Sequence, residues 1–188
     1  LVRCGGCGAK LSSDILYRVL KRLKVKSNPE ILVGCTPGDD AAVIRLPDGK
    51  IQLQTIDFFK EFISDPYLFG RIAANNALSD IYAMNGSPAF ALALVTIPFA
   101  GSGFRESQLF QVMSGALETL NKNGVTLAGG HTTESVDFQI GFSITGYANE
   151  GRLFKKNALK HGDHLIVTKP FGTGVLLRAA MMGKCTWY

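Results

Sequence analysis

The chain has 188 residues, of which 46% are hydrophobic, and its formal net charge is +5 at pH 7. This composition excludes an intrinsically disordered protein, and the length allows one full domain or one domain with part of another. The four cysteines are too few for a disulfide-stabilised scaffold of this size, so we expect reduced thiols and a cytoplasmic protein.

Neither a membrane nor a nucleic acid is expected as a partner. The longest apolar stretch, residues 89–100, is interrupted by Thr96 and Pro98, and it is shorter than the roughly 20 residues that a membrane helix needs. We interpret it as a buried strand. The basic residues between 21 and 26 fall at the expected end of a helix, where cations suit the helix dipole, and no aromatic residues are interleaved with them.

Patterns typical of helices and strands alternate along the chain. Ser12 and Ser13 can cap a helix whose apolar residues recur at helical spacing as far as Leu23. The further elements expected, in chain order, are strands over 41–46 and 51–56 joined by a turn at 47–49, a helix from 65 to about 84, a strand over 90–97, a helix over 104–123 that ends at Gly124, strands over 125–128, 138–148 and 165–168, and a helix over 172–182. This order predicts an α/β protein, an α+β sandwich in which helices pack on one face of a mixed sheet.

Composition also divides the chain into three parts. Residues 1–10 are rich in glycine and cysteine and predict a flexible arm, and residues 11–161 hold the main α/β domain. The polar stretch 157–161 and Gly162 mark the expected boundary. Residues 162–188 would then begin a second domain that this chain cuts short.

Acidic residues lie in or beside the apolar elements, although the chain has only 15 Asp and Glu residues in all. Asp40 precedes a strand, Asp57 follows one, and Asp80 lies four residues after Asn76 on the same face of a helix. Buried carboxylates are usually paired or bound to a metal. We therefore predict that Asp40, Asp57, Asn76 and Asp80 hold Mg²⁺ together with phosphate groups. The alternative for Asn76 and Asp80 is an exposed polar stripe on an amphipathic helix.

The arm places a thiol and an ammonium group close together. Lys10 could lower the pKa of the Cys7 thiol and stabilise charge on a phosphate that is being transferred. The alternative is a disordered terminus. Cys4 and Cys7 have the spacing of zinc ligands, but no second cysteine pair follows, so no structural zinc site is expected.

A glycine pair follows the strand expected over 125–128. Gly129 and Gly130 would let backbone N–H groups approach an anion, and a plain tight turn is the alternative. His131 is either a catalytic group or a structural histidine.

Several of these segments resemble selenophosphate synthetase (selenide, water dikinase), and they occur in the order found in that family. The matching segments are Cys7-Gly8-Ala9-Lys10, Gly38–Val43 (GDDAAV), Thr55–Phe59 (TIDFF), Phe69–Met84 (FGRIAANNALSDIYAM), Leu127–Thr132 (LAGGHT) and Lys169–Val175 (KPFGTGV). The resemblance covers essentially the whole chain.

The resemblance implies the fold of aminoimidazole ribonucleotide synthetase, with an N-terminal α/β domain that forms a homodimer through its sheet. It implies that ATP, selenide and water become selenophosphate, AMP and phosphate. Mg²⁺ would be held by Asp40, Asp57, Asn76 and Asp80. Cys7 would handle selenium, Lys10 would act on the phosphates, and ATP would be contacted by Lys10, Asp57, Asn76, Asp80, Gly129, Gly130 and His131.

Two departures and three alternatives accompany this interpretation. Ala9 stands where some members have a second cysteine, which implies single-thiol chemistry at Cys7. The chain stops at Tyr188, so nearly all of the second domain is absent, and we expect the fragment alone to be inactive. The first ten residues resemble the form fused behind a pyridine-nucleotide-disulfide oxidoreductase. The alternatives are another ATP-using member of the superfamily, such as a thiamine monophosphate kinase or a hydrogenase-maturation enzyme, a non-catalytic dimerisation module, and a redox protein built on Cys4 and Cys7.

Overall fold

The computed structural model describes residues 10–36 and 38–184. Its centre is a six-stranded mixed sheet with the order β1-β2-β3-β6-β4-β5. The strands are β1 (Ile31–Val33), β2 (Ala42–Arg45), β3 (Ile51–Lys60), β4 (Ser87–Pro98), β5 (Thr126–Ser135) and β6 (Gln139–Ala148). The pair β4 and β5 is parallel, and the other neighbouring strands are antiparallel.

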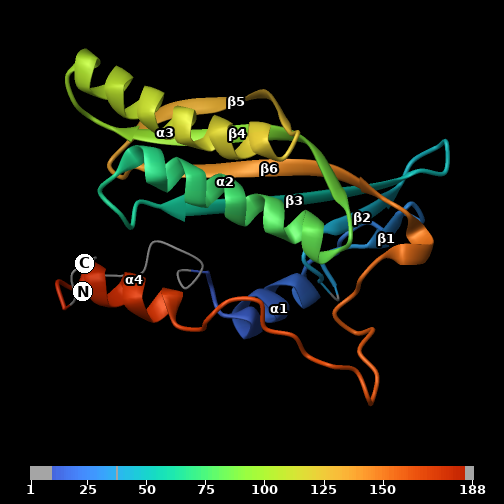
Figure 1. The fold of residues 1–188 in the computed structure, drawn as a ribbon. Coiled ribbons are helices and arrows are strands. Elements are labelled where there is room, and N and C mark those ends of the chain that lie inside the picture. The colour runs from blue at the N-terminus through green and yellow to red at the C-terminus, as the bar shows by residue number, and fades with distance from the viewer. Residues whose placement is uncertain (1–9, 37, 185–188) are drawn as a thin grey trace.

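Two long helices cover one face of this sheet, as Figure 1 shows. Helix α2 (Pro66–Ala83) connects β3 to β4, and α3 (Ser102–Lys122) connects β4 to β5. Both connections step across the sheet in the same direction, and crossovers between parallel strands are nearly always right-handed. Both helices therefore lie on the same face, which confirms the expected architecture.

The core lies between the sheet and these helices. Along β3 every second side chain is buried, from Ile51 through Phe59, as the two-residue period of a strand requires. Helix α2 buries eight residues, and its Phe69 meets Phe62 and Phe138 edge to face, with ring centroids 5.4 and 5.7 Å apart. The face of the sheet that carries Asp57 is thus the covered one.

Helices α2 and α3 approach each other closely at two glycines. A Cβ atom on Gly70 would lie 1.9 Å from the carbonyl oxygen of Val112, and one on Gly115 would lie 1.9 Å from that of Tyr67. Each added atom would meet backbone rather than a movable side chain. Glycine is therefore required at both positions for this packing distance.

Three of the expected elements need correction, and one further strand was not expected. The strand expected over 125–128 continues as β5 to Ser135, because it pairs with β4 along its whole length, so Gly129 and Gly130 lie within a strand and not in a turn. Residues 165–168 are not a strand, since no neighbouring strand pairs with them. The three-residue strand β1 was not expected, and β3 reaches Lys60 because it pairs with β6 up to that residue.

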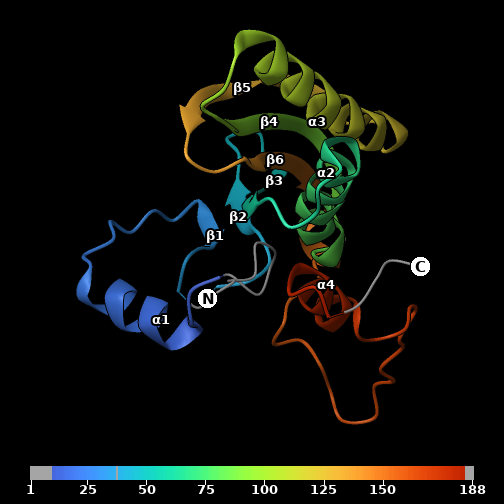
Figure 2. The ribbon, with the colours of Figure 1, turned by 90° about the vertical axis from the view of Figure 1, so that its left-hand side faces the viewer.

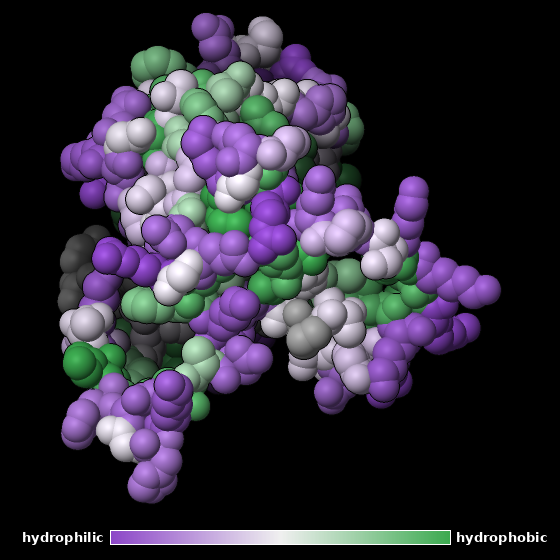
Figure 3. Space-filling model, turned by 90° about the vertical axis from the view of Figure 1, so that its right-hand side faces the viewer, coloured by the Kyte–Doolittle hydropathy of each residue, from purple (hydrophilic) through white to green (hydrophobic). Residues whose placement is uncertain are grey.

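The segments that flank this body are mostly exposed. Helices α1 (Ser13–Arg22) and α4 (Thr173–Met181) have no buried residues, and both lie below the sheet in Figure 2, on opposite sides. Figure 3 shows two projections below the body, with green hydrophobic residues on their surfaces. Among the described helices, none combines the length and the apolar character needed to cross a bilayer.

Candidate functional site

The predicted site residues of β3 and α2 face one another along the seam between the two elements. Asn76 Nδ2 donates to Asp57 Oδ2 at 2.6 Å. Thr55 Oγ1 donates to Asp80 Oδ2 at 2.7 Å. The structure therefore brings three of the four predicted metal-binding residues into one polar cluster.

Asp57 is the most buried carboxylate of this cluster, with only 4% of its surface exposed. Its Oδ1 lies 2.6 Å from the Nζ of Lys10, the first residue that the structure describes. Asp57 pairs across the sheet with Phe142, so the strand register fixes the covered face for its side chain. A buried carboxylate needs such partners, because removing its charge from water costs several kcal/mol (order of magnitude) when nothing compensates it.

The electrostatics of Asp80 link the whole cluster. Burial raises the pKa of its carboxyl group above the ordinary value, and the negative charges of Asp57 and Asp40 act in the same direction. The hydrogen bond from Thr55 and the positive charge of Lys10 oppose this rise in pKa. Asp40 is thus close enough to Asp80 to influence its titration.

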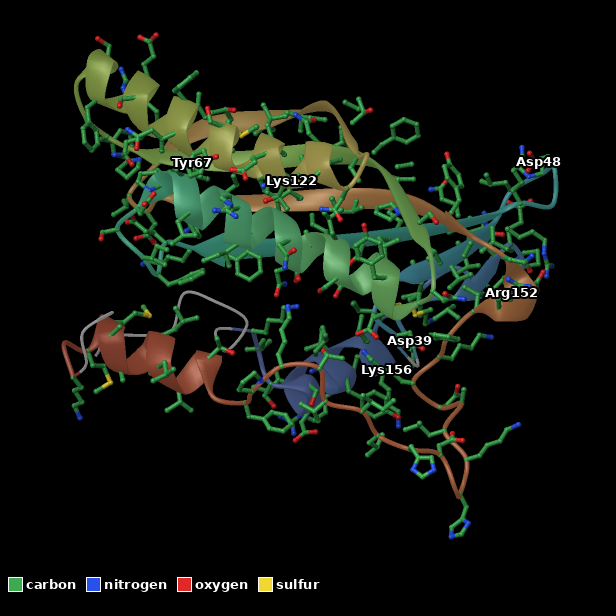
Figure 4. All side chains as sticks on the ribbon, in the orientation of Figure 1. Asp39, Asp48, Tyr67, Lys122, Arg152 and Lys156 are labelled. Carbon is green, nitrogen blue, oxygen red and sulfur yellow. The ribbon has the colours of Figure 1, made fainter. Side chains whose placement is uncertain are left out.

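Asp40 lies just before β2, next to Asp39, and both carboxylates meet Lys156. The Nζ of Lys156 lies 2.8 Å from Asp40 Oδ1, and its backbone N–H donates to Asp39 Oδ2 at 3.1 Å. Figure 4 shows Asp39 and Lys156 next to each other between α2 and α1. Residues 117 positions apart in the chain are joined here.

A hollow of about 920 Å³ opens beside this second cluster, between α1, β1 and residues 155–157. Asp39 and Lys156 line it together with Lys21, Lys26 and Lys155. Its size is that of a small-molecule pocket. Its basic lining favours an anionic occupant.

The donor set suits Mg²⁺ in chemical type. Three carboxylates and a side-chain amide offer the hard oxygen atoms that this ion prefers. Within residues 10–36 and 38–184, however, no group of three or more Asp, Glu, His or Cys side chains is arranged to hold a metal ion. Instead, the ammonium group of Lys10 forms an ion pair with Asp57, and that of Lys156 forms an ion pair with Asp40.

The remaining predicted residues lie elsewhere. Asp57 pairs with Phe142 of β6, Phe142 with Ala93 of β4, and Ala93 with Gly130 of β5. Gly130 is therefore three strand spacings from Asp57, a distance of about 14 Å. His131 is the next residue along this extended strand, so its side chain points to the opposite, open face. One copy of the chain therefore does not bring the β5 residues to the carboxylates, and Cys7 lies outside the described residues.

Thr55 beside Asp80 and Lys156 beside Asp40 were not predicted as site residues. Thr55 is two positions before Asp57 in a strand, so the alternating pattern could have placed it on the same face. No local signal could have identified Lys156, since its contacts with Asp39 and Asp40 depend on how distant segments pack.

Comparison with known proteins gives both a family and a fold. Residues 38–148 match the family "AIR synthase related protein, N-terminal domain". The chain is 44% identical to "Selenide, water dikinase" of Pelobacter propionicus over 97% of the chain and 52% of that protein. It is 43% identical to the protein of the same name in Desulfitobacterium hafniense over 96% of the chain and 52% of that protein. The chain thus spans about half the length of these curated relatives.

Two solved structures share the fold. The protein tt0281 from Thermus thermophilus aligns with a TM-score of 0.64 and 24% identity, over 79% of this chain and 47% of that one. A structure described as AaThiL complexed with AMPPCP and TMP aligns with a TM-score of 0.62 and 21% identity, over 85% of this chain and 48% of that one. The family match covers more than half of the chain and includes Asp40, Asp57, Asn76 and Asp80, and the chain therefore belongs to the AIR synthase related family, as its N-terminal domain.

Proposed function

We propose that the complete protein containing this chain makes selenophosphate from ATP, selenide and water, with release of AMP and phosphate. The observation that carries this proposal is the 44% identity to a selenide, water dikinase over 97% of the chain. The cluster of Asp57, Asn76 and Asp80 beside Lys10 supports it, because phosphoryl transfer depends on positioning and on neutralising charge. A cytoplasmic location belongs to the same proposal, since the reaction consumes ATP.

Under this proposal Asp40, Asp57 and Asp80 hold Mg²⁺, with Asn76 at the same site. The bound ion would neutralise charge on the phosphates of ATP. Lys10 supplies a second positive charge beside Asp57. The proposal also gives Cys7 the handling of selenium, and it gives Gly129, Gly130 and His131 contacts with nucleotide.

The test is an assay of the complete protein for AMP formation from ATP with and without selenide. We expect AMP and phosphate to form together, with selenophosphate visible by ³¹P NMR, only when selenide and Mg²⁺ are both present. ADP release without selenide, with a phosphorylated small molecule as product, would instead identify a kinase of the thiamine monophosphate kinase type. Fusion to an oxidoreductase domain stays a prediction.

The same proposal includes a homodimer formed through the open face of the sheet. Large hydrophobic side chains are exposed there on three neighbouring strands: Ile56, Phe58, Phe90, Leu92 and Tyr147. Strand register places Ile56, Ser143 and Leu92 in one row, so the exposed patch is continuous. A patch of this kind marks an interaction surface.

Sedimentation tests the dimer directly. We expect twice the chain mass of 20.3 kDa, and a shift to the monomer for Leu92→Glu. Val136→Glu is the control, because Val136 is 83% exposed and lies in the turn between β5 and β6. A monomer in the unmodified protein would exclude this interface.

A further inference from the structure

The two hydrogen bonds at the seam form a reciprocal pair. Strand β3 provides the donor Thr55 and the carboxylate Asp57, while helix α2 provides the donor Asn76 and the carboxylate Asp80. The donor on the strand thus binds the carboxylate on the helix, and the donor on the helix binds the carboxylate on the strand. Besides joining α2 to the sheet, each hydrogen bond fixes one oxygen atom of a carboxylate.

The spacing of the two elements makes this pairing possible. Strand β3 runs away from the β2–β3 hairpin, which carries Asp48, and helix α2 begins near Tyr67 and runs back, as Figure 4 shows. Two residues of a strand advance by about 6.6 Å, and four residues of a helix by about 6 Å. Because the two elements run in opposite directions with nearly equal steps, Thr55 lies opposite Asp80 and Asp57 lies opposite Asn76.

Packing alone does not require a hydroxyl group at position 55. Thr55 is 9% exposed, and its neighbours across the sheet are Ile144 of β6 and then Ala91 of β4. Valine has almost the same shape and would suit this apolar row. The hydroxyl group is instead directed at Asp80, and the carbonyl oxygen of Thr55 accepts a hydrogen bond from Ser143 Oγ at 3.2 Å.

We propose that Thr55 is a positioning residue that fixes the carboxylate of Asp80 for a divalent cation, and that Asn76 does the same for Asp57. This inference rests on the proposed function, because it concerns the cation of that same site. Thr55 holds Oδ2 of Asp80, which sets the direction of Oδ1. Neutral partners of this kind orient metal-binding carboxylates without adding charge.

The experiment measures cation binding and does not depend on selenophosphate formation. Mn²⁺ serves as the probe, and electron paramagnetic resonance of free Mn²⁺ gives its Kd for the complete protein in the presence of ATP, with the same Mn²⁺–ATP mixture without protein as the baseline. We expect Thr55→Val to weaken Mn²⁺ binding by about 10- to 100-fold. Its thermal unfolding should stay close to that of the unmodified protein. Thr126→Val, at the exposed start of β5, is the control and should change neither value.

A second pair of variants keeps the test decisive if Thr55→Val fails to fold. Thr55→Ser and Thr55→Ala differ only by the hydroxyl group, and we expect the serine variant alone to retain Mn²⁺ binding. Equal Kd values for the two would overturn the proposal. If Asp80→Asn abolishes Mn²⁺ binding while Thr55→Val does not, the positioning role fails and the proposed function stands. If Asp80→Asn also leaves binding unchanged, the metal-binding part of the proposed function fails as well.

Discussion

Helices α1 and α2 both carry apolar residues at helical spacing, yet they stand in opposite relations to the rest of the molecule. Helix α2 is packed against the sheet and α3 and buries eight residues, whereas α1 buries none. Leu16, Val19 and Leu23 at α1 remain 47–56% exposed. Amphipathic spacing therefore predicts that a helix forms but not what covers it.

The candidate site also combines residues of the packed body with residues of the exposed flanking segments. The carboxylates of Asp57 and Asp80 come from the packed body, while the ammonium groups of Lys10 and Lys156 come from segments that flank it. Under the proposed function, a charged ligand would replace these counter-charges while the carboxylates keep their positions.

Glycine substitutions give the largest expected contrast between body and flank. Gly70→Ala places a Cβ atom 1.9 Å from the Val112 carbonyl oxygen, so α2 and α3 must separate at a cost of about 3 kcal/mol or more in the free energy of unfolding. Gly174→Ala in α4 meets no atom within 4 Å, and it should stabilise that helix by about 0.5–1 kcal/mol. Urea denaturation measures both. Equal effects would contradict the distinction between the two regions.

Leucine truncations sharpen the comparison of α2 with α1. Leu78 is 1% exposed, and Leu78→Ala should cost about 2–5 kcal/mol through lost burial and the cavity left behind. Leu16 is 50% exposed, and Leu16→Ala should change the free energy of unfolding by no more than about 0.5 kcal/mol. Thermal denaturation of the two variants provides the measurement. A large loss at Leu16 would show that α1 is covered in solution.

A surface contact on the body gives the smallest expected effect. Glu118 of α3 accepts hydrogen bonds from Lys122 and from the Tyr67 hydroxyl group of α2, and these lower its pKa from 4.5 to about 2. Because the folded-state pKa is the lower one, the stabilisation is present above pH 4.5 and is lost as the pH falls toward about 2.

Glu118→Gln isolates this contribution. The difference in stability between the unmodified chain and the variant should be constant above pH 4.5 and shrink below it. The effect is small because solvent screens a group at the surface. Denaturation midpoints measured across this pH range provide the comparison, and a difference that grows on acidification would refute the assigned cause.

Much of the body could be predicted from sequence because its signals are local. Helix α2 was expected to begin at Asp65, whose side chain accepts the backbone N–H of Leu68 as the N-cap, and Gly124, the expected end of α3, has a φ of 68°. The extension of β5 through Gly129 could not be predicted, because pairing with β4 rather than local preference decides it. Lys156 escaped prediction for the same reason, since its site contacts are entirely long-range.

For the candidate site, the positions of some residues could be predicted from sequence, but their roles could not be tested. Asp57, Asn76 and Asp80 meet as the strand and helix periods predict, whereas their roles toward metal and nucleotide stay predictions. Gly129, Gly130 and His131 were assigned to the same nucleotide site, but in one chain they lie on β5, away from the carboxylates. The boundary expected near Gly162 also stays a prediction.

The position of β6 has a consequence for how the protein is made. This strand is the last of the six in the chain, yet it lies between β3 and β4 and pairs with both along most of its length. During synthesis, a chain that has grown as far as residue 138 therefore contains the two halves of a sheet without its centre. Such non-local pairing is slow to form, and the exposed strand edges make the incomplete chain prone to aggregation until residue 148 has emerged.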